Sequence, residues 1–215
     1  MFKYQETLEN KIEEKSIRDL IKKGISKALS YNEYRLLMDH LVLKSGTTGV
    51  EQSQMYKDYT KLNQQRMKRL DKTIKVSEDS RAKIGGISYK ITWLVLTESW
   101  CGDAAQTIPV INKLALLNTN ISLKIIQRDE HLELMECFLT NGSRSIPKLL
   151  AIDPVSYDVL WTWGSRPSEA TQLADEYKKE HGELTPQFKE KLQVWYNKDK
   201  GKNTVSDLMH LLSLE

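Results

Sequence analysis

The sequence predicts an α/β fold preceded by a mostly helical extension, and three observations support this. Apolar residues in the first 80 positions recur at intervals of three and four, as they do on one face of a helix. From about residue 87 onward, short apolar runs alternate with helical segments, which is typical of α/β structure. A chain of 215 residues can bury about 70% of its unfolded surface, so it needs no disulfide bonds to fold.

The extension, residues 1–80, is expected to form three helices. The first places six apolar residues on one face: Ile17, Leu20, Ile21, Ile25, Ala28 and Leu29. The second spans residues 31–43 and is followed by the turn at 46–49. The third spans residues 51–75, and its apolar face is interrupted by Arg66 and contains Met55, Tyr59, Leu62, Leu70 and Ile74. Residues 77–88 are interpreted as a polar connection broken by Gly85 and Gly86.

The remaining strands and helices are predicted from the alternation of short apolar runs with segments whose apolar residues have helical spacing. Buried strands are expected over residues 89–97, 121–127, 148–152 and 157–163. Helices are expected over residues 103–117, 130–139, 168–181, 186–196 and 204–214. A turn at 153–156, with a proline and an acidic residue, joins the last two strands as a hairpin.

Composition argues against several classes of partner. A formal net charge of +3, dispersed along the chain, is too small to indicate nucleic acid. The longest apolar run, residues 93–96, is far shorter than the roughly 20 residues that span a membrane. We therefore expect a cytoplasmic protein with no membrane partner, in which both cysteines are thiols. Four scattered histidines, no Cys-x-x-Cys and no phosphate-binding glycine loop predict no metal and no cofactor.

Two short motifs occupy places that carry chemistry in a known fold. The segment Ser99-Trp100-Cys101-Gly102-Asp103-Ala104 joins the first strand to its helix, and Ser145-Ile146-Pro147 precedes the third strand. With the order of elements between residues 87 and 181, these motifs resemble the thioredoxin family. The resemblance implies a thioredoxin-like core over residues 87–181, with a central mixed sheet flanked by helices. Residues 182–215 would then pack on this core as C-terminal helices.

Within that family, the sequence resembles a bacterial branch with a single-cysteine Trp-Cys-Gly-Asp-Ala motif. Thioredoxins have a second, resolving cysteine where this chain has Ala104, and commonly a buried aspartate where it has Val95. Both residues serve the resolution of a mixed disulfide. The resemblance therefore implies at most a monothiol site at Cys101.

The reactivity of Cys101 depends on two opposing effects. A cysteine in the first turn of a helix is favoured as thiolate by about 0.3–1 kcal/mol, up to roughly 2 kcal/mol when partly buried. The carboxylates of Asp103 and Glu98 disfavour a second negative charge nearby. The sequence leaves the sign of the net effect open.

The resemblance also implies a substrate-binding surface around the thiol. It would be formed by Trp100, Gly102, Asp103, Ile146 and Pro147, where a cis proline leaves the backbone of Ile146 free to pair with an extended segment. Three arginines are candidates for an anion site or for structural ion pairs: Arg128, Arg144 and Arg166. We favour ion pairs, with Asp103 as a possible partner. Cys137 is interpreted as a buried free thiol, too far from Cys101 for a disulfide bond.

Two functions remain open at this stage. In the first, the Cys101 thiolate attacks a protein disulfide or a low-molecular-weight disulfide, and an external thiol resolves the mixed disulfide, as in redox homeostasis. In the second, the protein is a redox-silent module that binds an extended peptide. Only the first function would make the protein an enzyme, a monothiol-disulfide oxidoreductase.

Overall fold

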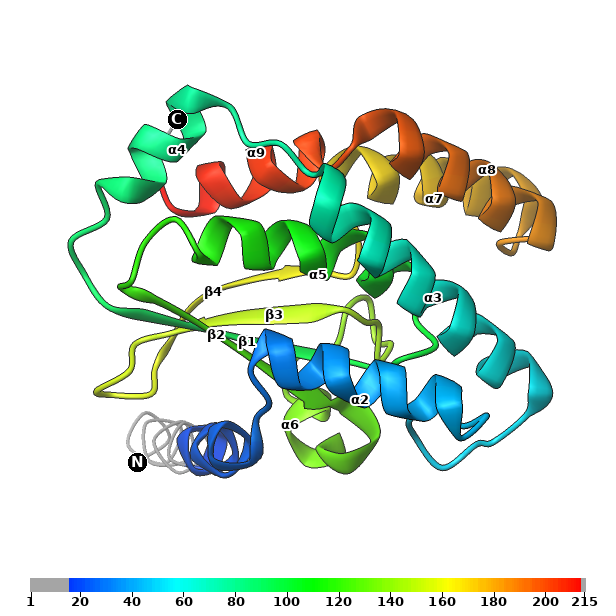
Figure 1. Cartoon of the computed structure of the whole chain (residues 1–215), viewed down its shortest axis with the longest axis horizontal. Coiled ribbons are helices and arrows are strands. Elements are labelled where there is room, and N and C mark those ends of the chain that lie inside the picture. The colour runs from blue at the N-terminus through cyan, green and yellow to red at the C-terminus, as the bar shows by residue number, and fades with distance from the viewer. Residues whose placement is uncertain (1–15, 214–215) are drawn as a thin grey trace, which may run out of the picture.

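The computed structural model describes residues 16–213 (Figure 1). Helices occupy residues 16–27 and the ranges α2 (Tyr31–Leu43), α3 (Gln54–Thr73) and α4 (Glu78–Gly85). Predictions for residues 1–15, and for residue 214 of the last helix, lie outside the described residues. The second helix has the predicted bounds. Ser30 caps its N-terminus, because its hydroxyl accepts from the Glu33 N–H and Glu33 reaches back to the Ser30 N–H.

The remaining elements alternate between strands and helices. The strands are β1 (Ile91–Thr97), β2 (Ile121–Gln127), β3 (Lys148–Ile152) and β4 (Val159–Gly164). The helices are α5 (Gly102–Ala115), the 3-10 turn η1 (Arg128–Glu130), α6 (Leu132–Glu136), α7 (Ser168–His181), α8 (Pro186–Asp199) and α9 (Lys202–Leu211).

The four strands form one mixed sheet in the order β2-β1-β3-β4. β1 pairs in parallel with β2, while β3 is antiparallel to both β1 and β4. All seven residues of β1 are buried, because this strand lies between two others and helices cover both of its faces. The predicted α/β fold, with a central mixed sheet flanked by helices and a helical extension, is confirmed.

Helices cover the two faces of this sheet in separate layers (Figure 1). α5 and α9 lie on one side, and α6 and the helix through residues 16–27 lie on the other. α2 lies beside the edge strand β2, and the residue two positions before it, Leu29, forms an antiparallel bridge with Ile125 of that strand. α3 crosses from α2 to α5, which brings the extension against the start of α5. Within residues 16–213, no helix is both long enough and apolar enough to cross a membrane.

Two predicted segments differ from the structure. The polar connection at residues 77–88 contains a helix, α4, which starts where the Ser77 hydroxyl accepts from the Ser80 N–H. Glu78 and Asp79 then stabilise its first turn, so local capping outweighs the weak apolar pattern. The helix predicted over residues 130–139 is shorter, because η1 takes up its start and α6 ends at Glu136.

The predicted apolar face of α3 is wrong over the first half of the helix. Met55, Tyr59 and Leu62 are exposed, whereas the buried residues of this helix are Thr60, Asn63, Met67 and Leu70. The buried face is partly polar because Thr60 and Asn63 make hydrogen bonds to the segment before α5. Hydrophobic periodicity alone cannot identify such a face.

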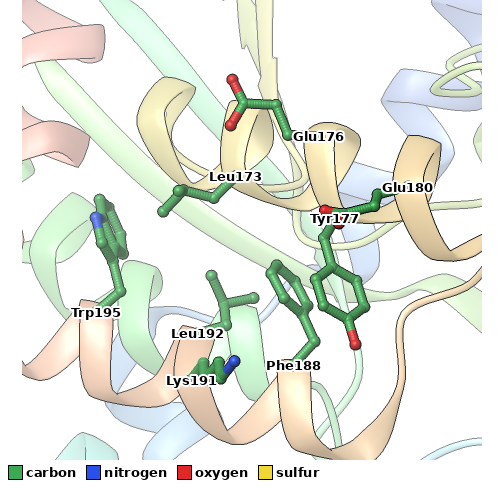
Figure 2. A pocket seen from close by; sticks show the side chains of 8 residues that line it. All are labelled: Leu173, Glu176, Tyr177, Glu180, Phe188, Lys191, Leu192 and Trp195. Carbon is green, nitrogen blue, oxygen red and sulfur yellow. The ribbon is translucent and has the colours of Figure 1, made fainter.

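α7 and α8 share a small hydrophobic cluster that is separate from the main core. It consists of Ala170, Ala174, Phe188, Leu192 and Tyr196. A cavity of about 290 Å³ lies between the two helices, with Leu173 and Tyr177 on α7 and Phe188, Leu192 and Trp195 on α8 (Figure 2).

Candidate functional site

Cys101 lies at the junction of β1 and α5, as the N-cap residue of α5. Its Sγ accepts a hydrogen bond from the Ala104 N–H at 3.5 Å and donates one to the Ile146 carbonyl oxygen at 3.3 Å. The Ile146–Pro147 peptide bond is cis. The two motifs that were singled out in the sequence therefore meet at the sulfur atom, with Ala104 buried at the place of a second cysteine.

The environment of Cys101 favours the protonated thiol. The residue is 7% exposed, and this burial, followed by the nearby charge of Asp103, raises its pKa to about 12. The N–H groups of Ala104 and Asp103 and the charge of Arg166 oppose the increase. The question that the sequence left open is thus answered: desolvation outweighs the start of the helix, and the resting group is a thiol.

Asp103 is held by two partners that come from the C-terminal half of the chain. Arg166 Nε lies 2.9 Å from Asp103 Oδ2, and the Tyr196 hydroxyl donates to Asp103 Oδ1 at 3.0 Å. Burial raises the pKa of Asp103, while the charge of Arg166 and the hydrogen bond from Tyr196 oppose that increase. The expected ion pair between an arginine and Asp103 is present, and it extends to α8 through Tyr196.

Ser99 connects the cysteine segment to the N-terminal extension. Its Oγ accepts from the Thr48 N–H at 2.9 Å and hydrogen-bonds with the Thr60 hydroxyl at 2.8 Å. Its N–H donates to Thr48 Oγ1 at 2.8 Å, and its carbonyl oxygen accepts from Asn63 Nδ2 at 2.9 Å. Thr47 completes the group at 3.1 Å from Ser99 Oγ. All five residues are buried, so this network fixes the backbone two residues before the thiol.

Glu98 makes a second connection on the other side of the same segment. Its Oε1 accepts from the Asp129 N–H at 2.8 Å, and its carbonyl oxygen accepts from the Cys101 N–H at 3.1 Å. Burial raises the pKa of Glu98. The loop before α3 packs here through Gly49, whose φ is +81° and whose Cβ, if present, would lie 2.6 Å from Asp129 Oδ2. Only glycine fits this position without a shift of the loop.

Trp100 is packed between two side chains rather than lying open. Its ring stacks on Tyr56 of α3, with centroids 4.6 Å apart and planes at 9°. The guanidinium carbon of Arg128 lies 5.2 Å from the centroid of the Trp100 ring. Such stacking stabilises the orientation of the indole beside Cys101.

The other two predicted arginines also pair with carboxylates. Arg128 Nη2 lies 2.8 Å from Asp129 Oδ1, and Arg144 forms an ion pair with Glu136. Gly102, which follows Cys101, is covered by the extension and by α8: a Cβ built on it would meet Arg66 Nη1 at 3.5 Å and Gln193 Nε2 at 3.6 Å. Trp100 and Gly102, the residues before and after the thiol, therefore contact neighbouring helices.

The prediction for Cys137 is wrong. This cysteine is exposed, at the C-terminal end of the short helix α6, and its thiol donates to the Glu133 carbonyl oxygen at 3.3 Å. α6 ends at Glu136, so Cys137 is its C-cap residue and not part of a helix that continues to residue 139. Both cysteines are thiols in the structure.

Sequence reasoning missed the residues that surround the thiol from outside the predicted core. Thr47, Thr48, Thr60 and Asn63 are polar and carry no periodic signal, and Tyr196 lies far from Asp103 in the sequence. Arg66 gave one usable signal, since a charged residue interrupted the expected apolar face of α3. Among residues 16–213, no group of three histidine, cysteine or acidic side chains is placed to hold a metal ion.

Comparison with known proteins identifies one family and two similar structures. A sequence model described as thioredoxin matches residues 49–178, which includes α3 as well as the sheet. A crystal structure of a protein of unknown function from Pseudomonas aeruginosa matches with a TM-score of 0.56 and 18% identity, over 71% of this chain and 84% of that one. An HIV epitope scaffold matches with a TM-score of 0.54 and 16% identity, over 86% of this chain and 98% of that one. At these identities the two structures show the fold alone. No curated protein matches the chain.

Proposed function

The chain belongs to the thioredoxin family, and we propose that it takes part in thiol–disulfide exchange through a single cysteine, Cys101. The observation that carries this proposal is the position of the sulfur atom. Sγ lies at the start of α5, within hydrogen-bond distance of both the Ala104 N–H and the Ile146 carbonyl oxygen. A disulfide presented along the loop at Ile146 and Pro147 would therefore meet the sulfur and the N–H groups that stabilise a thiolate.

The proposed exchange has two stages. The Cys101 thiolate attacks one sulfur of a partner disulfide, so a Cys101–partner disulfide forms and the other partner sulfur leaves as a thiolate that takes up a proton. A small thiolate then attacks the Cys101 sulfur, which releases the partner as a thiol and leaves Cys101 joined to the small thiol. A second small thiolate attacks the small-thiol sulfur of that bond, which yields the small disulfide and restores Cys101. The partner disulfide is reduced, and two small thiols are oxidised.

The raised pKa of Cys101 determines how fast the first stage runs. Only the thiolate attacks, and a pKa of about 12 leaves a very small thiolate fraction at neutral pH. We expect slow exchange with small disulfides, and faster exchange with a partner that displaces the residues around the thiol. Cytoplasmic location is part of the proposal, because a reducing compartment supplies the small thiol that resolves the intermediate.

The same burial supports a second candidate, a redox-silent module that binds an extended segment beside Trp100 and Ile146. Here the Cys101 thiol would serve as a hydrogen-bond donor to the Ile146 carbonyl oxygen and would never react. Ala104 at the resolving position is compatible with either function.

Trapping of mixed disulfides separates the two candidates. The Cys137→Ser variant leaves Cys101 as the sole thiol, and it would be incubated with a peptide disulfide, quenched with acid and weighed by intact-protein mass spectrometry. We expect one adduct, absent from the matched Cys101→Ser/Cys137→Ser variant and removed by added glutathione. The matched positive control is a short peptide that carries one free cysteine. If this control reacts with the peptide disulfide while the Cys137→Ser protein stays unmodified, the binding module is favoured.

A further inference from the structure

The positive charges around Cys101 are not all neutralised. Each of the three arginines that the sequence singled out has a carboxylate partner: Arg128 with Asp129, Arg144 with Glu136, and Arg166 with Asp103. A carboxylate of a reaction partner that bound to one of these arginines would have to displace the carboxylate that the protein already supplies. None of these three arginines therefore offers a free charge.

Arg66 differs from them. Within residues 16–213, no carboxylate lies within 4.0 Å of its guanidinium, and its Nη1 donates to the neutral Asn63 Oδ1 at 3.0 Å. The side chain is half-buried, and burial, followed by the like charge of Arg69, lowers its pKa. Asp103 attracts it from a greater distance, but that carboxylate is already paired with Arg166. Two arginines and one aspartate thus leave a surplus of one positive charge.

This surplus charge lies beside the reactive segment. Arg66 Nη1 is 3.5 Å from the position that a Cβ on Gly102 would occupy, and Gly102 directly follows Cys101. The side chain is held there by a chain of hydrogen bonds from Arg66 to Asn63 and from Asn63 to the Ser99 carbonyl oxygen. A guanidinium whose position is fixed loses little freedom when it binds an anion, and partial burial strengthens the attraction.

We propose that Arg66 binds a carboxylate of the small thiol or disulfide that reacts with Cys101, and so selects anionic reaction partners. The inference rests on the proposed function and deepens it, since it names the charge of the second reactant. A planar guanidinium recognises a carboxylate with two parallel hydrogen bonds, and only Nη1 has a protein partner among the described residues. The anchored carboxylate would hold the reacting sulfur near the start of α5.

Three aliphatic disulfides of different charge test this selectivity in the Cys137→Ser background. They are glutathione disulfide, which carries carboxylates, neutral 2-hydroxyethyl disulfide, and cationic cystamine. The rate of Cys101 modification would be followed by intact-protein mass spectrometry, and the ratio of the glutathione rate to the neutral rate is the readout. We expect Arg66→Gln to lower this ratio by about tenfold, since a charge-assisted pair is lost. Arg66→Lys keeps the charge but loses the planar geometry and should give an intermediate ratio.

Arg69→Gln is the matched control, because Arg69 lies on the same helix, carries the same charge and directs its side chain to Asn197 Oδ1 at an exposed position. We expect its ratio to change by less than about twofold. Two outcomes would overturn the proposal. One is an unchanged ratio in Arg66→Gln. The other is an equal fall in Arg66→Gln and Arg69→Gln, which would assign the effect to the general charge of α3. Because the readout is a ratio, any effect of Arg66→Gln on the Cys101 thiol itself acts on both rates and cancels.

A binding measurement separates failure of this proposal from failure of the proposed function. If none of the three disulfides modifies Cys101, even at pH 10, exchange with small disulfides is wrong, and the anion site is then tested in the Cys101→Ser/Cys137→Ser protein. S-methylglutathione, which cannot react, would be titrated and followed by NMR shifts of α3 and α5 amides. We expect saturable shifts that disappear in the Arg66→Gln version of this protein. Their absence with Arg66 in place would contradict the anion site.

Discussion

Two helices, α3 and α8, contact the segment from Ser99 to the first turns of α5 in different ways. α3 contacts it through neutral, buried groups: the Thr60 hydroxyl and the Asn63 amide hydrogen-bond to Ser99. α8 contacts it through the Tyr196 hydroxyl, which donates to Asp103, and through a hydrogen bond from Gln106 to Gln193. α8 also packs with α7 in a small cluster outside the main core.

The difference indicates separate roles for the two helices. Neutral buried hydrogen bonds are costly to break and do not depend on pH or salt, so α3 fixes the backbone before Cys101. The contact of α8 is made to a carboxylate beside the thiol, so it modifies the charge that Cys101 experiences. Variants on the two sides should therefore separate stability from reactivity.

The largest effect is expected from Ser99→Ala, which removes the hydroxyl at the centre of the buried network. Thr47 and Thr60 keep their hydrogen bond to each other, and Thr48 Oγ1 still accepts from the N–H of residue 99. The Thr48 N–H loses its acceptor, and leaving one buried polar group unsatisfied costs about 1–3 kcal/mol. We expect the free energy of unfolding to fall by about 1–3 kcal/mol in urea denaturation. Ser26→Ala, at an exposed serine, is the control and should change it by less than about 0.5 kcal/mol. Equal, small changes in both variants would show that the network does not hold α3 on the core.

Asp103→Asn should change reactivity with a smaller effect on stability. The charge of Asp103 is the second cause of the raised Cys101 pKa, and its removal also leaves the Arg166 charge free to favour the thiolate. We expect the Cys101 pKa to fall by about one unit, and the rate with 2-hydroxyethyl disulfide at pH 8 to rise about tenfold. The exposed Asp175→Asn is the control on α7. A slower reaction in Asp103→Asn would mean that Asp103 activates the thiol.

Tyr196→Phe should give the smallest effect on reactivity, in the same direction. The ring stays in the cluster between α7 and α8, but Asp103 loses the hydrogen bond that lowers its pKa. The loss raises the pKa of Asp103 further and so favours its neutral form, which does not repel the Cys101 thiolate. We expect a rise in the same assay that is smaller than the rise in Asp103→Asn. The double variant Asp103→Asn/Tyr196→Phe should react no faster than Asp103→Asn alone, and additive effects would show that Tyr196 acts by another route.

The sequence was sufficient to predict the sheet and the two motifs of the site. β2 and β3 have the predicted bounds because each is a short apolar run between clear breaks, and Trp100-Cys101-Gly102 with Ile146-Pro147 carried the resemblance. The surroundings of the thiol could not be predicted. Ser99, Thr48 and Asn63 act through hydrogen bonds across long sequence separations, which no local pattern reports.

Contacts between residues far apart in the sequence also explain why the buried face of α3 was predicted wrongly and why the Cys101 pKa could not be predicted. Helix α3 buries Asn63 and exposes Leu62 because specific polar partners outweigh the hydrophobic pattern. The sign of the Cys101 pKa shift depended on burial by neighbouring elements, and the sequence does not show how closely they pack. The first turn of α5 alone would have suggested an activated thiolate.

The pH dependence of Cys101 modification tests the central claim most directly. The Cys137→Ser protein would react with 2-hydroxyethyl disulfide between about pH 7 and 10, with adducts at Cys101 quantified by mass spectrometry. Because burial and Asp103 raise the pKa to about 12, the thiolate fraction grows about tenfold per pH unit over this range, and we predict a rate that rises accordingly without a plateau. A plateau anywhere in this range would contradict the shielded, protonated thiol, and the absence of any Cys101 adduct at every pH would contradict exchange with small disulfides.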